Sequence, residues 1–492
     1  MTTFWGLTCE AAERWPDRVI LADDYGRTLT TTELRDAAEV VAAALDVQPG
    51  DVVSWQLPTT LEAPVLMLAL SRLGVVQNPV ITFLRHREVR SITTQLDTTL
   101  FVTPETWRGF AHGDMAREMG CRVLALDFEG EPGPALRLPM GDPSTLPPAP
   151  TEPGRWVYFS SGTTADPKGA RHTDETLISS SGGMTDLMGF NGDDVYPIAW
   201  PFPHIGGSTM LSTALRVGYE LVLFDAFDPA TTPERMAAFK PTILGSAQPF
   251  FRAYLDAQKR HGDEQLFPHV RACTAGGAPT PAEIVHELAD AFGITGVAQS
   301  WGLTEFPIAT SATPDDPPEV LANTVGRPSP GVEVRVVDGE LRLKGPQCCR
   351  GYLDPALDAA GFDEEGWFRT GDLGEVRPDG NVVITGRLKD VIIRNAENIS
   401  ALEIEDVLLR HPGVADVAVI GIPDPRTGER VVAIIAPRDG ATFDVPTVAE
   451  HCQANGLAKH KCPEQVELVA AIERNAMGKI LKQQLRESLL KG

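Results

Sequence analysis

A short loop of small and hydroxylated residues is the segment of this sequence with the clearest capacity for chemistry. Residues 161–169 read Ser-Gly-Thr-Thr-Ala-Asp-Pro-Lys-Gly and follow an apolar stretch that ends at Ser160. Backbone amides in such a loop can approach a polyphosphate closely, because few side chains shield them. The hydroxyls of Thr163 and Thr164 can bind phosphate oxygens or magnesium, and Lys168 adds a positive charge. The pattern predicts a phosphate-binding loop, and a flexible serine-rich turn is the simpler alternative.

Other candidates stand in turn-like segments along the rest of the chain. Glu305 can bind magnesium through its carboxylate, and Asp372 can accept hydrogen bonds from two neighbouring hydroxyls. Lys479 follows Gly478, where a flexible turn would let a compact ammonium reach developing negative charge. Each residue also has an ordinary structural interpretation, as a solvated carboxylate, a turn aspartate or a surface lysine. Residue type and spacing alone leave both interpretations open.

Composition restricts the classes of protein to which this chain can belong. Its 492 residues exceed what one hydrophobic core usually supports, which predicts at least two domains. Forty-three Lys and Arg against 67 Asp and Glu give a net charge of −24, which disfavours nucleic acids and anionic membranes as partners. Any anionic substrate must then be bound by a local group of donors.

No sequence signal points to a membrane or to secretion. No apolar run reaches the roughly 18 residues that a membrane-spanning helix needs. Residues 1–10 lack the basic-then-apolar pattern of a secretion signal. The seven cysteines are scattered without the paired spacing of a zinc site, which favours reduced thiols. We therefore expect a cytoplasmic protein without a membrane span.

The elements that must position the candidate residues are of the α/β type over most of the chain. Helical periodicity over residues 34–45 and 63–73 alternates with apolar, strand-like runs over 51–57 and 75–80. Such alternation predicts an α/β architecture.

The pattern changes in the last third of the chain. Residues 333–337 and 340–344 alternate apolar and polar side chains, which predicts antiparallel hairpins with one solvated face. A smaller α+β unit begins after Gly386. Its predicted helices cover 404–409 and 448–455, and its predicted strands cover 414–422 and 431–436. The sequence thus predicts a large domain over 1–386, built of α/β subdomains and a small β-rich subdomain, and a small domain over 387–492.

Six segments, in order along the chain, resemble the motifs of the adenylate-forming superfamily. That superfamily includes acyl-CoA synthetases, luciferases and the adenylation domains of peptide synthetases. The first segment is the loop over 161–169. The others are Gly276-Gly277-Ala278-Pro279, Ser300-Trp301-Gly302-Leu303-Thr304-Glu305, Thr370-Gly371-Asp372, Gly386-Arg387-Leu388-Lys389-Asp390 and Asn475-Ala476-Met477-Gly478-Lys479. The resemblance covers essentially the whole chain, and its order excludes chance.

The resemblance implies an enzyme that uses one site for two reactions. A carboxylic acid first attacks the α-phosphate of ATP, which gives acyl-AMP and pyrophosphate. The thiol of CoA then attacks the acyl-AMP. The implied catalytic residues are Lys479, Thr164, Glu305 and His204, with Mg²⁺ held by Thr164 and Glu305. The implied ATP- and AMP-binding residues are Ser161, Gly162, Thr163, Thr164, Lys168, Gly276, Gly277, Ala278, Ser300, Trp301, Gly302, Thr304, Asp372, Arg387 and Lys479.

The same resemblance implies that the small domain is mobile. It would rotate about a hinge near Lys389, so that the loop over 394–400 replaces Lys479 at the site between the two reactions. The implied contacts to CoA and the hinge are Lys389, Asn395, Ala396 and Glu397. Ala165 and Ala396 stand where glycine is usual in the family, so each adds a methyl group that strains the backbone or narrows the site.

The resemblance also indicates which acid is activated. The residues implied to form the acyl pocket are His204, Gly206, Gly207, Met210, Phe250 and Gly302. Residues 200–208 carry no acidic side chain that could hold the amine of an amino acid. Gly302 stands where acetate-specific relatives have a tryptophan, which predicts an acid larger than acetate. Residues 53–58 resemble CoA ligases for alicyclic and short or medium acids, such as cyclohexanecarboxylate, so we expect a compact hydrophobic acid.

Two other functions fit the same motifs. One is an adenylating enzyme that loads a carrier protein, which the acidic composition disfavours because carrier proteins are acidic too. The other is a non-catalytic nucleotide-binding sensor, against which the joint presence of Lys168, Glu305, Asp372 and Lys479 argues. The sequence leaves the oligomeric state open, with a homodimer as one option.

Overall fold

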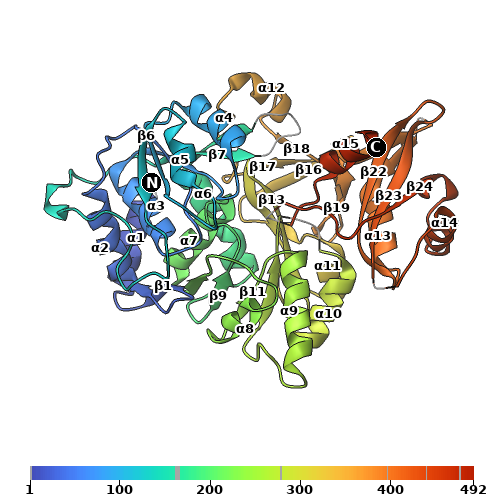
Figure 1. Cartoon of the computed structure of the whole chain (residues 1–492), viewed down its shortest axis with the longest axis horizontal. Helices are drawn as coiled ribbons and strands as arrows, with labels where there is room; N and C mark the ends of the chain where they lie inside the picture. Colours follow the sequence, from blue (N-terminus) through green and yellow to red (C-terminus); the bar gives the residue numbers. More distant parts are fainter. Residues whose placement is uncertain are drawn as a thin grey trace.

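The computed structural model describes residues 3–160, 167–277, 280–395, 397–438, 440–475 and 478–491. Figure 1 shows a large part, coloured blue to yellow, and a smaller unit beside it in orange and red. The large part contains three sheets with parallel strands and one antiparallel sheet, and the smaller unit has a sheet of its own. These features confirm the predicted fold class. Among the described residues, no helix is both long enough and apolar enough to cross a membrane.

A six-stranded sheet carries the predicted phosphate loop at its edge. Its strand order is β6-β5-β3-β4-β7-β8, and only the last pair is antiparallel. The strands are β3 (Val52–Trp55), β4 (Val76–Pro79), β5 (Leu100–Pro104), β6 (Arg122–Leu126), β7 (Arg155–Ser160) and β8 (Lys168–Thr173). The predicted loop joins β7 to β8, and its residues 161–166 lie outside the described residues. Ser160 pairs with Lys168 across the two strands, which places both ends of the loop.

Two further sheets complete the α/β portion of the large part. One has the strand order β2-β1-β10-β9 and the other β11-β12-β13-β14-β15. The strands are β1 (Val19–Asp23), β2 (Thr28–Thr30), β9 (Val195–Ile198), β10 (Glu220–Leu223), β11 (Ile243–Leu244), β12 (Ala272–Ala275), β13 (Val297–Leu303), β14 (Phe306–Ser311) and β15 (Arg327–Pro328). Parallel pairing of β11, β12 and β13 brings their carboxyl ends to one edge of the sheet, where the site is built.

The helices of the large part connect and cover these strands. They are α1 (Phe4–Arg14), α2 (Thr31–Ala42), α3 (Glu62–Leu73), α4 (His86–Leu96), α5 (His112–Arg117), α6 (Asp174–Ser179), α7 (Ile205–Val217), α8 (Thr232–Ala237), α9 (Gln248–His261), α10 (Ala282–Phe292), α11 (Pro318–Asn323) and α12 (Asp358–Gly361). Every residue of α3 is buried, as expected for a helix that is apolar on nearly all sides. The helix α2 begins three residues before the prediction, because Thr30 and Glu33 form a capping box.

An antiparallel sheet forms the predicted β-rich subdomain. Its strands are β16 (Glu333–Val337), β17 (Glu340–Lys344), β18 (Phe368–Val376) and β19 (Val382–Arg387), in that spatial order. The first two match the predicted strands residue for residue. Asp338 and Gly339 join them with φ values of 53° and 82°, the left-handed conformation that a tight two-residue hairpin turn requires.

The smaller unit has a hydrophobic core separate from that of the large part. Its strands are β20 (Val391–Arg394), β21 (Glu397–Ser400), β22 (Val414–Asp424), β23 (Gly428–Pro437) and β24 (Gln465–Leu468), and its helices are α13 (Ala401–Leu409), α14 (Val445–Ala454) and α15 (Lys482–Lys491). Ile392, Ile404 and Ile435 belong to a buried cluster made of residues of this unit alone. A unit with its own core can move as a body relative to its neighbour.

Few polar contacts join the two parts. A short 3-10 turn, η4 (Leu388–Asp390), links β19 to β20. Arg410 lies 3.7 Å from Glu283 of α10, and a guanidinium nitrogen of Arg474 donates to Gln248 Oε1 at 3.4 Å. A third contact is shorter: the Ser400 hydroxyl of β21 donates to the Thr385 carbonyl oxygen of β19 at 2.7 Å. The first two contacts are long and polar, so they add little to the cost of separating the two faces.

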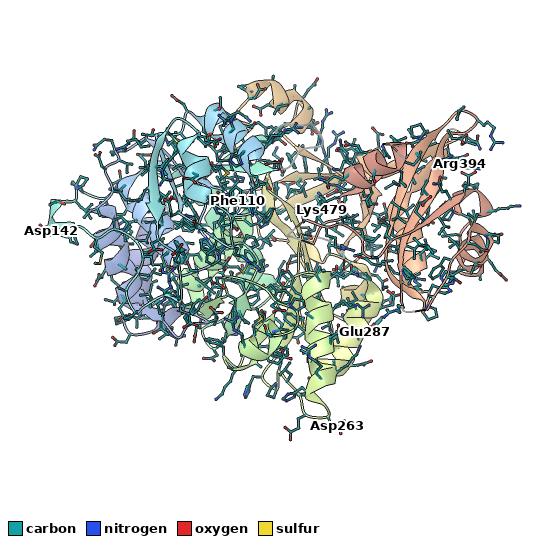
Figure 2. The ribbon with its side chains drawn as sticks, viewed as in Figure 1. Phe110, Asp142, Asp263, Glu287, Arg394 and Lys479 are labelled. Atoms are coloured by element: carbon teal, nitrogen blue, oxygen red, sulfur yellow. The ribbon has the colours of Figure 1, made fainter. Side chains whose placement is uncertain are left out.

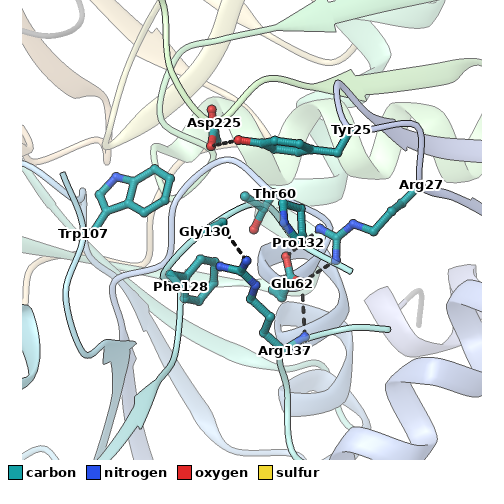
Figure 3. A pocket seen from close by; sticks show the side chains of 10 residues that line it. All are labelled: Tyr25, Arg27, Thr60, Glu62, Trp107, Phe128, Gly130, Pro132, Arg137 and Asp225. Carbon is teal, nitrogen blue, oxygen red and sulfur yellow. Dashed lines mark hydrogen bonds and ion pairs between the residues drawn. The ribbon is translucent and has the colours of Figure 1, made fainter. Parts of the chain in front are cut away.

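A buried charge network stabilises the large part away from this junction (Figure 3). The Arg27 guanidinium donates to Asp23 at 2.7 Å and to both oxygens of Glu62 at 2.8 and 3.2 Å. The backbone N–H of Arg137 also donates to Glu62. The Glu62 side chain is fully buried. Burial alone would raise the pKa of Glu62, but the hydrogen bonds and the charge of Arg27 lower it below its ordinary value.

We expect the Glu62→Gln variant to lose about 3 kcal/mol of unfolding free energy, because it leaves the Arg27 guanidinium buried with one counter-charge fewer. Urea denaturation measures the loss. Since the pKa of Glu62 is depressed in the folded state, the difference from the unchanged protein should be present at neutral pH and should shrink as the pH falls below 4.5. Glu118→Gln breaks an exposed pair with Arg90 and should cost under about 1 kcal/mol. Equal losses in the two variants would contradict this account.

Candidate functional site

The carboxyl ends of β12 and β13 bring two of the predicted nucleotide-binding segments together. Ala275 pairs with Gln299, so Gly276 follows β12 beside Ser300 of β13. A Cβ atom built on Gly276 would lie 3.6 Å from the Ser300 carbonyl oxygen. Gly277 has a φ of 80°, which glycine adopts without strain. Ala278, the third predicted residue of this segment, lies outside the described residues.

Thr304 and Glu305 form the two-residue turn between β13 and β14. Leu303 pairs with Phe306 on either side of it. Glu305 is 8% exposed, and one of its oxygens, Oε1, accepts hydrogen bonds from the Ser160 hydroxyl at 3.1 Å and from the Tyr352 hydroxyl at 3.0 Å. The predicted magnesium ligand is therefore held next to the end of β7, where the predicted phosphate loop begins.

The buried side chain of His172 holds the backbone of the same turn. His172 of β8 lies 2.9 Å from the Thr304 carbonyl oxygen through Nε2 and 2.9 Å from the Thr176 hydroxyl through Nδ1. Burial lowers the pKa of His172 to about 4, so its ring is neutral at physiological pH. A carbonyl oxygen only accepts, so Nε2 carries the proton and donates to Thr304.

Sequence analysis missed Ser160, His172 and Tyr352 as residues of the site. Their partners in the turn lie 145, 132 and 47 positions away along the chain. No local spacing signals contacts over such separations, and only the pairing of β7, β8 and the 349–353 segment reveals them.

Asp372 joins two of the predicted segments directly. Its Oδ2 accepts from the Trp301 indole N–H at 2.9 Å, and its Oδ1 lies 2.5 Å from Nε of Arg387. Asp372 and Arg387 are also paired across β18 and β19. Asp372 is 6% exposed. Trp301, Asp372 and Arg387 come from separate motifs, and all three were predicted to bind the nucleotide. The Asp372 carboxylate brings them together.

Lys479 lies at the junction between the two parts of the molecule (Figure 2). A Cβ atom built on the preceding Gly478 would lie 3.3 Å from Pro249 and 3.4 Å from Ala247, which shows how closely this loop packs on the start of α9. The Arg474 guanidinium donates to the Gly478 carbonyl oxygen at 2.6 Å and braces the turn. The predicted catalytic lysine is thereby brought to the edge of the large part.

Arg387, Lys389 and Lys479 form a group of neighbouring cations, which we call the cationic cluster. The pKa of Lys479 falls to about 8, first because protein surrounds the ammonium and then because Arg387 and Lys389 repel its charge. The Lys479 side chain as a whole is exposed. Burial and the charge of Arg387 also lower the pKa of Lys389. The cluster is thus suited to an anion, which would relieve the repulsion.

Of the residues predicted to contact CoA or form the hinge, Lys389 belongs to the cationic cluster, whereas the loop that carries the others begins elsewhere. Figure 2 shows Arg394, at the start of their loop, on the outer side of the smaller unit and away from Lys479. The Arg394 guanidinium is paired with Glu464 at 2.7 Å. Asn395 has a φ of 50° in the turn between β20 and β21, and Glu397 is exposed. Ala396 lies outside the described residues.

His204 lines a pocket beside the turn that carries Thr304. The pocket is walled mostly by apolar side chains: Pro79, Val80, Ile81, Leu84, Ile92, Tyr158, Phe159, Pro203, His204, Ile205 and Thr304. His204 caps α7, and its Nδ1 accepts from the Gly206 N–H at 3.2 Å. Burial lowers the pKa of His204 to about 4, so the ring is neutral. Met210 and Phe250, both buried, are not among the residues that line this pocket.

Close packing against neighbouring atoms explains why glycine stands at the three positions predicted for the acyl pocket. A Cβ atom on Gly207 would lie 1.9 Å from the Phe202 carbonyl oxygen, so no side chain fits. A Cβ atom on Gly206 would lie 3.3 Å from the Trp200 ring. At Gly302 the nearest atom would be the Ile308 backbone nitrogen, 2.5 Å away on β14. The close approach of β14 therefore requires glycine at 302, independently of any bound acid.

The described residues fit a magnesium ion that is held mainly by substrate oxygens. Glu305 Oε2 receives no hydrogen bond from the described part of the chain, while Oε1 is engaged by two hydroxyls. Nowhere among the described residues do three His, Cys, Asp or Glu side chains gather as a metal site. Mg²⁺ commonly binds one or two carboxylates together with phosphate oxygens and water. Thr164, the second predicted ligand, lies outside the described residues.

Comparison with known families identifies the chain. Residues 9–353 match the family model described as AMP-binding enzyme, and residues 403–479 match that of the AMP-binding enzyme C-terminal domain. The chain belongs to the AMP-binding enzyme family. This confirms the resemblance that the motifs indicated, and with it the predicted enzyme class of AMP-forming acid–thiol ligases.

Relatives of this AMP-binding enzyme act on different acids. A Mycobacterium tuberculosis enzyme named 3-[(3aS,4S,7aS)-7a-methyl-1,5-dioxo-octahydro-1H-inden-4-yl]propanoyl:CoA ligase is 32% identical, over 96% of this chain and 96% of its own. A sulfoacetate–CoA ligase from Cupriavidus necator is 30% identical, over 98% and 97%. A salicyl-AMP ligase/salicyl-S-ArCP synthetase from Mycobacterium tuberculosis is 31% identical, over 98% and 89%.

Solved structures of one relative bear on the arrangement of the two parts. ATP-bound MatB from Rhodopseudomonas palustris superimposes with a TM-score of 0.85, at 29% identity and over 98% of each chain. The apo form of the same enzyme gives a TM-score of 0.74. The present AMP-binding enzyme is thus closer in its overall arrangement to the ATP-bound form of that relative.

The depressed pKa of Lys479 predicts a high-pH limit to the reaction. Below pH of about 8 the ammonium is charged, and above it the lysine becomes neutral. We expect kcat/KM for ATP in pyrophosphate release to fall as the pH rises above about 8, provided that the charge of Lys479 is required. In Lys479→Arg the guanidinium stays charged, so a weaker activity should persist through the same range. If kcat/KM fell over the same alkaline pH range in the unchanged enzyme and in Lys479→Arg, Lys479 would not be the group that causes the fall.

Proposed function

We propose that this enzyme is a carboxylate–CoA ligase, which converts an acid, ATP and CoA into acyl-CoA, AMP and pyrophosphate through an acyl-adenylate. The observation that carries the proposal is the cationic cluster beside Asp372. In this region Asp372 of β18 pairs with Arg387 at the end of β19, and Lys479 of the C-terminal loop lies near both. A site with excess positive charge suits a reaction between two anions, the carboxylate and the α-phosphate of ATP.

In the first half-reaction a carboxylate oxygen attacks the α-phosphorus, and the bond to the β-phosphate oxygen breaks, so that pyrophosphate leaves. Catalysis of such a displacement is mostly positioning and charge neutralisation. Lys479 would bridge the carboxylate and the α-phosphate with its ammonium. Asp372 would accept from the ribose hydroxyls. Thr304 would donate to the phosphate.

Magnesium, when bound by Glu305 and Thr164, would neutralise charge on the phosphates. The remaining nucleotide contacts of the proposal come from the loop over 161–169 and from Gly276, Gly277, Ser300 and Trp301. Gly276 and Gly277 follow the carboxyl end of β12, and Ser300 and Trp301 lie on the neighbouring strand β13, which supports this role because nucleotides bind at such edges.

In the second half-reaction the CoA thiol attacks the acyl carbon and AMP leaves. We propose that the domain over 387–492 then turns on the domain over 1–386, with its hinge near Lys389. Two observations support the turn. The three-residue linker η4 is the covalent joint, and polar contacts between described residues of the two parts are few, with the short bond from Ser400 to Thr385 lying next to that linker. Rotation would withdraw Lys479 and present the loop with Asn395, Ala396 and Glu397 to the thiol.

The pocket beside His204 supports a compact hydrophobic acid as substrate. Most of its walls are apolar, and His204 is neutral because burial lowers its pKa to about 4. No described side chain lining it carries a charge. Such apolar walls suit the bicyclic propanoyl group in the name of the Mycobacterium tuberculosis relative better than the sulfoacetate in the name of the Cupriavidus necator relative.

A second candidate is an enzyme that passes the acyl group to a carrier protein. The salicyl-S-ArCP synthetase among the relatives favours it. The net charge of −24 disfavours it, because like charges slow the approach of an acidic carrier protein.

Removing the Lys479 ammonium should separate binding from chemistry. We expect Lys479→Ala to reduce acid-dependent pyrophosphate release by roughly 10²-fold or more, since a transition-state charge contact is lost. Its Kd for ATP, measured by calorimetry, should change by less than about tenfold, because one of several phosphate contacts is removed. Lys259→Ala, on the exposed side of α9, is the control and should leave both quantities unchanged. A non-catalytic sensor would show no acid-dependent release in either protein.

The acceptor and the acid can be tested together. Pyrophosphate release is measured with ATP, magnesium and a panel of acids, with and without CoA. We expect repeated turnover only with CoA, and the highest kcat/KM for compact hydrophobic acids such as cyclohexanecarboxylate. One equivalent of pyrophosphate per enzyme, unaffected by CoA, would instead support the carrier-protein function.

A further inference from the structure

We propose that Tyr352 is a positioning residue that aims the Glu305 carboxylate at the magnesium–nucleotide complex. This inference rests on the proposed function, in which Glu305 binds the metal. Tyr352 lies outside the six motifs. Its hydroxyl donates to Glu305 Oε1 at 3.0 Å, which makes it a direct neighbour of the carboxylate.

The two hydroxyls around Glu305 act on the same oxygen. Ser160 and Tyr352 both donate to Oε1, at 3.1 and 3.0 Å. A carboxylate whose one oxygen is held twice cannot rotate freely about its last torsion. The other oxygen, Oε2, is then presented in a single direction as a ligand for the metal. Residues that hold a metal ligand by hydrogen bonds commonly contribute to metal affinity for this reason.

The backbone of Tyr352 pairs with β8, the strand that follows the predicted phosphate loop. Tyr352 is 7% exposed and forms a β-bridge with Ala170 of β8. Its backbone N–H donates to Asp358 at 2.7 Å, and the next residue, Leu353, donates to the Gly169 carbonyl oxygen at 2.7 Å. The hydroxyl is thus placed relative to β8, so Glu305 takes its direction from the same strand that leads out of the loop.

The backbone of the turn is held separately, because the Cys349 N–H donates to the Glu305 carbonyl oxygen at 2.8 Å and His172 donates to that of Thr304 at 2.9 Å. Loss of the hydroxyl should therefore free the carboxylate without releasing the turn.

The test compares nucleotide binding with and without metal in Tyr352→Phe. Binding of ATP is measured by calorimetry with the full chain, once in magnesium and once in EDTA. We expect the variant to weaken binding by about 10- to 100-fold in magnesium, and by less than about twofold in EDTA. The magnesium concentration for half-maximal pyrophosphate release should rise by a similar factor. Tyr25→Phe removes a tyrosine–carboxylate hydrogen bond to Asp225 far from the site (Figure 3) and should change neither quantity.

Equal weakening in magnesium and in EDTA would overturn the proposal, since it would show a structural role only. So would a Tyr352→Phe enzyme with unchanged magnesium dependence. If Tyr352→Phe does not fold, Ser160→Ala removes the other donor to Oε1 and should show the same magnesium-selective loss; no such loss would also overturn it. The proposed function fails separately, if the unchanged enzyme releases no pyrophosphate with any acid while its ATP binding still depends on magnesium and on Tyr352.

Discussion

The placement of three cations beside two carboxylates is the constraint on which the candidate site depends. Burial lowers the pKa of Lys479 first, the charges of Arg387 and Lys389 lower it further, and Asp372 and Asp390 offset only part of the effect. Repulsion among such cations costs free energy unless a bound anion neutralises part of their charge. Because the cations come from the end of β19, from the linker and from the C-terminal loop, the two parts of the molecule must meet for the group to form.

The large part and the small part contribute differently held residues to the candidate site. Glu305 is held by hydroxyls from two sides and its turn is held by backbone contacts, so its position follows from the sheets of the large part. Lys479 instead follows Gly478, which packs against the start of α9. The next residue, Ile480, packs against a hydrophobic cluster of the smaller unit. The closer match to the ATP-bound form of MatB agrees with an arrangement in which this lysine faces the nucleotide edge.

Much of this was predictable from the sequence, and the exceptions have identifiable causes. Alternating side chains over 333–337 and 340–344 predicted β16 and β17 correctly, because a half-exposed hairpin has a strong local pattern. The start of α2 was missed, since a capping box lies before the apolar stripe. The family resemblance implied that Trp301, Asp372 and Arg387 belong to one site, and they do meet. Tyr352 and His172 had no such signal, and Gly302 owes its identity to the backbone of β14.

The hydrogen bond from Trp301 to Asp372 has an optical consequence. The indole N–H points at the carboxylate that is proposed to bind the ribose, and the ring is 8% exposed. Emission from an indole depends on the charge and the hydrogen-bond acceptor beside its nitrogen. The chain has eight tryptophans, and this one is bonded to the carboxylate of Asp372. The enzyme therefore carries its own fluorophore at the proposed nucleotide site, where we expect binding to be followed in real time without a label.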